Sequence, residues 1–260
     1  MIDKQPNQSA DTTPTEAFID FGFENVPRDE KVERVRAVFD SVADSYDVMN
    51  DVMSLGVHRL WKDALMDWMA PRPSQHLVDL AGGTGDISKR FLSRGGGSAE
   101  VVDINTEMMA AGQKRRDLAV FGDRLTWREG NAEKLPLEDA CCDRVTIAFG
   151  LRNVTDRQAA LSEAHRILKP GGRFCCLEFS SVNNPVLRGI YDRWSFDLLP
   201  IFGQLIAKDR ASYEYLVESI RRFPAQHELA DMFAEAGFAQ VRIRNLSGGI
   251  AAIHSGWKLD

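Results

Sequence analysis

Cysteine is scarce in this 260-residue sequence, and its placement argues against two kinds of site. The four cysteines form two adjacent pairs, Cys141-Cys142 and Cys175-Cys176. Adjacent residues rarely bridge each other, and cysteine metal sites need two or more residues between ligands. Both pairs lie in apolar, strand-like runs. We therefore expect small core residues in a reducing compartment, with no disulfide framework and no metal.

Long apolar runs and an excess of positive charge are also lacking. No apolar run reaches the roughly 18 residues of a membrane span, and the polar first residues, MIDKQPNQSADTTPTEAF, lack the apolar core of a signal peptide. We therefore expect a cytoplasmic protein with a disordered tail over 1–20. The net charge of −6 argues against a nucleic-acid partner, because phosphate binding needs a dominant basic surface. Peripheral contact with the inner face of the cell membrane stays open.

From residue 75 onward, strand-like and helix-like segments alternate. The strand-like segments are 75–81, 99–104, 124–130, 143–150 and 172–180. The helix-like segments are 85–94, 106–119, 156–168 and 225–236. This alternation predicts a parallel sheet covered by helices on both faces. Only a short SGG joins the last two strands, 239–246 and 250–258, which predicts an antiparallel hairpin.

Two segments lie outside this alternation. Residues 29–45 and 57–69 carry apolar side chains at helical spacing, which predicts a helical cap. An aromatic-rich stretch after a late strand is expected to lie over the cofactor crevice at the carboxyl ends of the strands. The single domain then has four parts: the cap (21–70), a cofactor-binding core (71–180), a lid or insertion (181–222), and a C-terminal helix with the hairpin (223–260).

The stretch VDLAGGTGD (78–86) places a glycine loop after the first strand of the core. Glycine lets a cofactor approach the backbone closely. ATP is disfavoured because Asp86 stands where a phosphate loop needs lysine. A dinucleotide is disfavoured because Ser88 replaces the third glycine of its fingerprint. Asp79 and Asp86 flank the loop with negative charge, which favours a cationic cofactor.

S-adenosylmethionine (SAM) is such a cofactor, since it carries a sulfonium and an ammonium but no phosphate. Asp103 ends the next strand, where a carboxylate can accept both hydroxyls of a ribose. The segment GNAEKLPL (130–137) follows the third strand and offers Asn131 and Ala132 to the edge and face of an adenine. Alone, this segment is equally typical of a loop with a turn-forming asparagine.

Two longer segments complete the pattern: FDSVADSYDVMNDVMSLGVHRLWKD (39–63) and FGLRNVTD (149–156). Together with the loop, Asp103 and GNAEKLP, they resemble the UbiE/COQ5 family of ubiquinone and menaquinone C-methyltransferases, within the class I SAM-dependent methyltransferases. The resemblance runs from about residue 21 to 258. It implies an α/β, Rossmann-like fold with a mostly parallel seven-stranded sheet of order 3-2-1-4-5-7-6, in which strand 7 is antiparallel. The core at 71–180 would then bind SAM.

The resemblance also implies a reaction and a set of cofactor contacts. The reaction is C-methylation of 2-polyprenyl-6-methoxy-1,4-benzoquinol, of demethylmenaquinol, or of both, with SAM as donor. The contacts fall on Thr84, Asp103, Asn131 and Ala132, and the loop argument adds Asp79, Gly83 and Gly85. Another family contact is often a serine before the Phe-Gly of the fourth strand. Here that residue is Ala148, so a hydroxyl contact is lost while a backbone contact stays open.

The chemistry of the acceptor indicates candidate catalytic residues. A benzoquinol carbon is a poor nucleophile until a ring hydroxyl loses its proton, so a base or a phenolate-stabilising cation is required. Arg152 and Asn153 follow the fourth strand, and Arg152, always protonated, is expected to stabilise the phenolate or orient a water. His58 and either Tyr46 or Asp47 are the other candidates. An Arg-Asn pair can also brace a loop, and a lone histidine is more often structural.

Three alternatives remain at this point. A SAM methyltransferase could act on another small molecule or on RNA, although segments 39–63 and 149–156 argue against both. A nicotinamide dehydrogenase is disfavoured by the missing third glycine. A catalytically inert scaffold of a quinone-synthesis complex would bind SAM without methylating a quinol. The expected partner is a polyprenyl quinol, and membrane contact, such a complex and a homodimer stay open.

Overall fold

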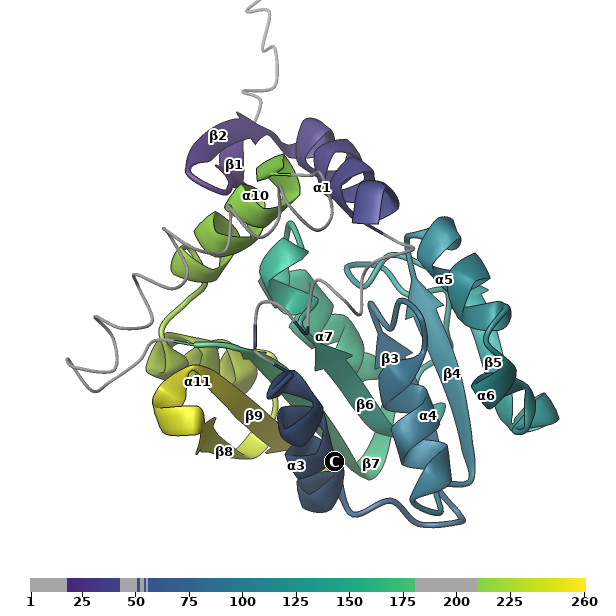
Figure 1. The fold of residues 1–260 in the computed structure, drawn as a ribbon. Helices are drawn as coiled ribbons and strands as arrows, with labels where there is room; N and C mark the ends of the chain where they lie inside the picture. Colours follow the sequence, from purple (N-terminus) through teal and green to yellow (C-terminus); the bar gives the residue numbers. More distant parts are fainter. Residues whose placement is uncertain (1–17, 43–50, 52–53, 55, 181–209) are drawn as a thin grey trace, which may run out of the picture.

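The fold is built on a central sheet of seven strands, seen in a computed structural model that describes residues 18–42, 51, 54, 56–180 and 210–260. The strands are β3 (His76–Leu80), β4 (Ser98–Asp103), β5 (Leu125–Glu129), β6 (Cys142–Ala148), β7 (Leu168–Phe179), β8 (Ala239–Leu246) and β9 (Ala251–Trp257). Their order is β5-β4-β3-β6-β7-β9-β8 (Figure 1). β9 is antiparallel to both neighbours, and the other pairs are parallel. The predicted order 3-2-1-4-5-7-6 and the terminal hairpin are confirmed.

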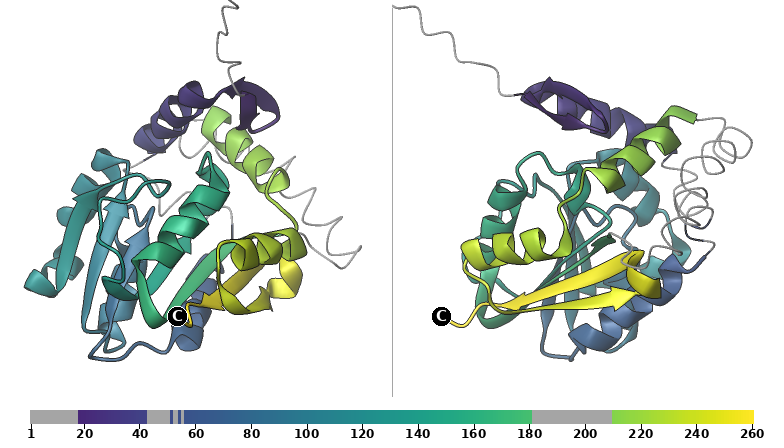
Figure 2. Two further views of the ribbon diagram at one scale, coloured as in Figure 1. Left: turned by 180° about the vertical axis from the view of Figure 1, so that it is seen from behind. Right: turned by 90° about the vertical axis from the view of Figure 1, so that its left-hand side faces the viewer.

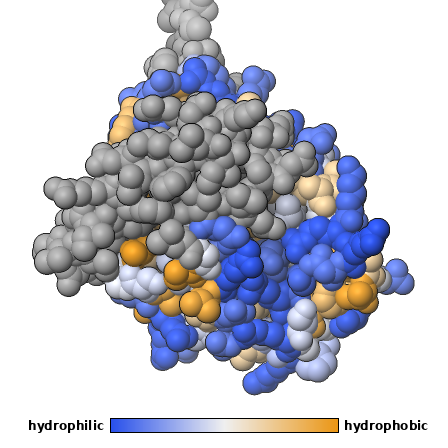
Figure 3. All heavy atoms as spheres, viewed as in Figure 1, coloured by the Kyte–Doolittle hydropathy of each residue, from blue (hydrophilic) through white to orange (hydrophobic). Residues whose placement is uncertain are grey.

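Helices cover both faces of the sheet (Figure 2). One face carries α3 (His58–Met69), α4 (Asp86–Ser93) and α6 (Arg116–Ala119), and the other carries α7 (Arg157–Ile167) and α11 (Gln226–Glu235). The helix predicted over 106–119 is in fact two, because the chain leaves α5 (Thr106–Gln113) and turns extended at Arg115 before α6. The outer surface over α3 and α4 is largely hydrophilic (Figure 3). In this region Arg90 and Arg94 of α4 both form ion pairs with Asp63 of α3.

The strands alternate their apolar side chains between two cores, as period-2 geometry requires. The cysteines follow this alternation. Cys175 packs with Trp61 and Leu65 beneath α3, whereas Cys176 faces the α7 and α11 side. Cys142, Cys175 and Cys176 are buried, and all four cysteines are free thiols. The prediction that they are small core residues is confirmed, with Cys141 at the border of the core.

The N-terminal part lies beyond the carboxyl ends of the parallel strands (Figures 1 and 2). It comprises a hairpin of β1 (Phe18–Phe21) and β2 (Glu24–Pro27), followed by α1 (Arg28–Val42). Residues 18–20, which were predicted to belong to a disordered tail, instead pair with β2. The hairpin was not predicted. Its strands have only four residues each. Phe21 stacks on Tyr215, far along the chain, with 4.3 Å between the ring centroids.

Part of the predicted lid lies beside this cap. Helix α10 (Arg210–Arg221) packs against α1 and against the short 3₁₀ helix η3 (Leu151–Asn153) that follows β6. The rest of the predicted insertion, residues 181–209, lies outside the described residues. Within the described ranges, no helix is both long and apolar enough to span a bilayer.

Candidate active site

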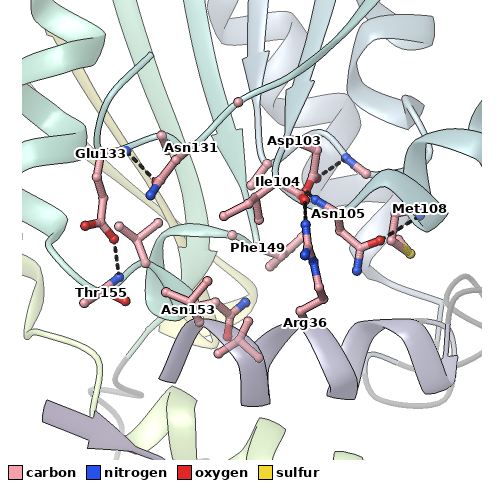
Figure 4. A pocket seen from close by; sticks show the side chains of 18 residues that line it. Arg36, Asp103, Ile104, Asn105, Met108, Asn131, Glu133, Phe149, Asn153 and Thr155 are labelled. Atoms are coloured by element: carbon pink, nitrogen blue, oxygen red, sulfur yellow. Dashed lines mark hydrogen bonds between the residues drawn. The ribbon is translucent and has the colours of Figure 1, made fainter. Parts of the chain in front are cut away.

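A pocket opens at the carboxyl edge of the parallel strands, with α1 forming one wall (Figure 4). The space within it, including its open mouth, is about 830 Å³. α1 contributes Val32, Val35 and Arg36 to the lining. Strand ends and loops contribute residues including Asp103, Asn131, Ala132, Phe149 and Asn153. The position matches the crevice expected for this sheet type.

Asp103 lies at the end of β4 and is aimed at the glycine loop. Its Oδ2 accepts a hydrogen bond from the Gly83 N–H at 2.8 Å, and its Oδ1 accepts from the Asn105 N–H at 2.8 Å. Burial raises the pKa of Asp103 in spite of these bonds. A carboxylate has about four acceptor positions, so Asp103 keeps capacity for hydroxyl donors in the pocket.

Gly83 makes room for a ligand beside that carboxylate. Its φ of +53° is unfavourable for other residues, and a Cβ there would come within 3.2 Å of the Met108 Cε and 3.9 Å of the Asp103 Oδ2. Gly85 is different. It begins α4 with φ +78°, its Cβ would lie 2.8 Å from the Trp127 ring, and it lines neither pocket described here. The missing Cβ of Gly85 therefore serves the packing of Trp127, and its predicted cofactor contact stays a prediction.

The loop after β5 forms another wall of the pocket. The Asn131 Oδ1 accepts a hydrogen bond from the Glu133 N–H at 2.9 Å, and the Thr155 N–H donates to the Glu133 Oε1 at 2.9 Å (Figure 4). Asn131 is thus held in place at the lining, beside Ala132. Sequence reasoning missed Arg36, whose Nη2 donates to the Ile104 carbonyl at 2.7 Å and ties α1 to the strand end after Asp103.

A second, smaller pocket lies beside the glycine loop. It shares Ala81, Gly83 and Phe149 with the larger pocket, and its lining also includes Thr84 and Ala148. Both Thr84 and Ala148 were predicted to contact the cofactor, and the structure brings them together here.

Asp79 lies at the buried side of this smaller pocket. Its carboxylate accepts hydrogen bonds from the Thr146 hydroxyl at 2.8 Å, the Ser88 hydroxyl at 3.0 Å and the Ser88 N–H at 3.2 Å. Burial outweighs these bonds and raises the pKa of Asp79 to about 6. The group therefore carries a negative charge at neutral pH, in a place where an adjacent cation would be favoured.

Among the catalytic candidates, Asn153 reaches the larger pocket and Arg152 does not. Tyr215 on α10 donates its hydroxyl to the Asn153 Oδ1 at 3.1 Å. Arg152 is buried, with its Nη1 donating to the Glu178 Oε1 at 2.9 Å and to the Phe149 carbonyl. Asn153 thus lines the pocket together with Phe149, whereas Arg152 is bound to Glu178 and to the Phe149 carbonyl outside the lining. Nothing in the local sequence indicated Glu178 or Tyr215 as partners.

The histidine and tyrosine candidates fall elsewhere. The His58 Nε2 lies 2.9 Å from the Asp51 Oδ1, and His58 lines neither pocket. Burial and the neighbouring Lys62 lower the pKa of His58 to about 4, so the ring is neutral at pH 7. Tyr46 and Asp47 lie outside the described residues. The described part of the chain contains no group of three or more His, Cys, Asp or Glu suited to a metal ion.

The fold and this pocket define a class I methyltransferase. The solved structures it resembles include a SAM-dependent methyltransferase from Thermotoga maritima, with a TM-score of 0.60 and 21% identity over 86% of this chain and 99% of that one. Another is Haemonchus contortus phosphoethanolamine N-methyltransferase 2 in complex with SAM, with a TM-score of 0.58 and 14% identity over 77% of this chain and 52% of that one. At these identities the likeness shows the fold alone.

The chain belongs to the ubiE/COQ5 methyltransferase family, whose model matches residues 27–258. A ubiquinone/menaquinone biosynthesis C-methyltransferase UbiE from Cereibacter sphaeroides is 57% identical over 240 residues, which is 92% of this chain and 96% of that protein. The protein of the same name from Acidiphilium cryptum is 56% identical over 93% of this chain and 97% of its own length. The family predicted from segments 39–63 and 149–156 is confirmed.

Proposed function

We propose that this chain transfers the methyl group of SAM to a ring carbon of a polyprenylated benzoquinol, of demethylmenaquinol, or of both, in ubiquinone/menaquinone biosynthesis. One observation carries the proposal beyond the family name. A single pocket brings Asp103 and Asn131, suited to a nucleoside, together with Asn153 of the family-specific segment 149–156. Donor and acceptor can therefore meet in one cavity, which is what methyl transfer requires.

The residues present fit SAM. When bound, its sulfonium would supply an electrophilic methyl group, with a neutral thioether as the leaving group. Asp103 would accept the two ribose hydroxyls with the lone pairs that Gly83 and Asn105 leave open. Asn131 and Ala132 would contact the adenine edge and face. The backbone at Gly83 has the close-approach geometry that such a ligand needs.

On the acceptor side, the chain must stabilise negative charge on a ring oxygen. The Asn153 Oδ1 is taken by Tyr215, and its amide nitrogen has no hydrogen-bond partner among the described residues. That nitrogen can donate to the phenolate oxygen as charge develops. Arg152 acts one step away as a positioning residue. Its bond to the Phe149 carbonyl holds Phe149 at φ +57°, an uncommon conformation for a residue other than glycine.

The apolar part of the lining suits the rest of the acceptor. Val32 and Val35 of α1 and Val154 after η3 line the pocket, where the ring and the first isoprenoid units could pack. The remainder of a long isoprenoid tail would stay in a bilayer. The proposal therefore includes peripheral contact with the inner face of the cell membrane.

The role of Asn153 offers a test by substitution. Asn153→Ala should lower the turnover of a short-chain demethyl quinol at least tenfold, because the phenolate loses its donor. Its affinity for S-adenosylhomocysteine, measured by calorimetry, should stay within about twofold of wild type. The control is Asn245→Ala on β8, which removes an exposed amide that contacts Gln226 and should change neither quantity. Unchanged turnover in Asn153→Ala would show that the Asn153 amide does not stabilise the phenolate.

A further inference from the structure

The smaller pocket contains charged groups of both signs. Lys62 of α3 lines it together with Asp79 and Asp86. Because Gly83 and Phe149 border both pockets, one extended ligand could lie across them. Its two ends would then meet different chemistry: hydroxyl-accepting and amide groups in the larger pocket, and paired charges in the smaller one.

Lys62 is the unusual residue of this pocket. It is 5% exposed, and its Nζ lies 2.9 Å from the Asp86 Oδ2, its one hydrogen-bond partner among the described residues. An ammonium has three donors, and burying it is costly unless they are used. Lys62 therefore retains donor capacity facing a cavity, in a place where solvent reaches it poorly.

Asp86 has a second cationic partner besides Lys62. The Arg90 Nε also donates to the Asp86 Oδ2 at 3.2 Å. Burial tends to raise the pKa of Asp86, but the charges of Lys62 and Arg90 outweigh it and lower that pKa to about 2. Asp86 thus stays ionised and anchors the ammonium, while Arg90 balances its charge. A second carboxylate could share Lys62 without leaving Asp86 unpaired.

We propose that Lys62 binds the α-carboxylate at the amino-acid end of the methyl donor, and that the smaller pocket holds this end. The inference rests on the proposed function. An amino acid is a zwitterion, so its site needs a cation and an anion close together. Lys62 supplies the cation, and the ionised Asp79 supplies the anion for the ammonium. Lys62 is the one Lys or Arg among the described residues that line this pocket.

The assignment gives the donor a direction. Its nucleoside lies toward Asp103 and Asn131, its amino-acid end lies toward Lys62, and its sulfonium lies at the shared border formed by Gly83 and Phe149. Asn153 lines the same larger pocket as Asp103 and Asn131. A simpler role for Lys62 is to tie α3 to α4 through Asp86, and the test must separate the two roles.

Two ligands that differ only at the amino-acid end make the separation. S-adenosylhomocysteine carries the carboxylate, whereas 5′-methylthioadenosine lacks the whole amino-acid end. In calorimetry, Lys62→Met should weaken S-adenosylhomocysteine binding roughly 10- to 100-fold, the effect of a lost charged hydrogen bond. Binding of methylthioadenosine should stay within about twofold of wild type. Lys62→Arg, which keeps the charge, should restore most of the affinity.

The matched control is Lys89→Met on α4. Lys89 also pairs with an aspartate, its Nζ lying 2.6 Å from the Asp117 Oδ2, but it lines neither pocket. This variant should bind both ligands as wild type does. If Lys62→Met does not fold, Lys62→Gln takes its place.

Three results would overturn the assignment. Equal binding of S-adenosylhomocysteine by wild type and Lys62→Met would show that Lys62 does not contact the carboxylate. Equal weakening of both ligands would show the purely structural role. If wild type binds neither ligand, the proposed donor itself is wrong, whereas the first two results leave the proposed function standing.

Discussion

At the residue scale, burial and charged neighbours give the two acids beside the glycine loop different pKa values. Asp79 and Asp86 both flank the glycine loop within VDLAGGTGD, and position alone does not distinguish them. The structure separates them. Asp79 is fully buried beside hydroxyl donors, and burial raises its pKa to about 6. Asp86 stays ionised because its two cationic partners, Lys62 and Arg90, lower its pKa to about 2. Their roles therefore differ: a titratable anion at the base of the smaller pocket, and an anchor for Lys62.

This difference predicts a pH effect on stability. Between about pH 4 and pH 6, folded Asp79 holds a proton that the unfolded chain has lost, so its contribution to the free energy of unfolding falls as pH rises. Asp79→Asn removes this term. Its stability relative to wild type should rise from pH 4 to pH 6, measured by urea denaturation. His58 has the opposite slope, but it is common to both proteins and cancels. A difference that does not change with pH would contradict the assignment.

Sequence reasoning at this scale worked where one residue's chemistry and position suffice. Asp103 and Asn131 follow strands directly and line the pocket as predicted. It carries no information about partners that are distant in the sequence. Arg152 forms a buried ion pair with Glu178, 26 positions away. Gly85 packs against the Trp127 ring of another strand, and its predicted cofactor contact stays a prediction.

At the scale of elements, the N-terminal cap depends on contacts that no local pattern reveals. The hairpin β1–β2 is short, and it is held through Phe21 on Tyr215 and through the Phe23 N–H, which donates to the Glu218 Oε2 at 3.0 Å. Both partners belong to α10, nearly 200 residues later in the chain. Helical periodicity predicted α1 and α3, but it carries no information about such partners. Tyr215 connects this cap to Asn153 and so to the pocket.

This link can be tested by removing one hydroxyl. Burial raises the pKa of Tyr215 well above its ordinary value, so its hydroxyl stays a donor at any working pH. Tyr215→Phe keeps the ring on Phe21 but frees the amide of Asn153 to rotate. We expect turnover to fall about fivefold, the effect of losing about 1 kcal/mol, with unchanged affinity for S-adenosylhomocysteine. Ser219→Ala, which removes a local hydroxyl bond on the same helix, should leave turnover unchanged. Equal losses in both variants would indicate a general effect on α10.

At the scale of the whole molecule, the alternation of strands and helices predicted the parallel sheet, and the short SGG predicted its antiparallel end. The order of the strands came from the family resemblance, because alternation alone allows several orders. The division of the site into two pockets was not predictable, since α1 lines one pocket and α3 lines the other, and their packing on the sheet edge depends on distant contacts. If Lys62 binds the carboxylate as proposed, this division would orient the donor.

The central claim is that a reduced quinol receives a methyl group on carbon. The most direct measurement supplies the purified chain with SAM carrying a deuterated methyl group and a short-chain demethyl quinol, and locates the label by NMR and mass spectrometry. We expect the label on the ring carbon, and no product from the oxidised quinone, which has no hydroxyl to ionise. Label on a ring oxygen, or no transfer by a protein that binds SAM, would contradict the account.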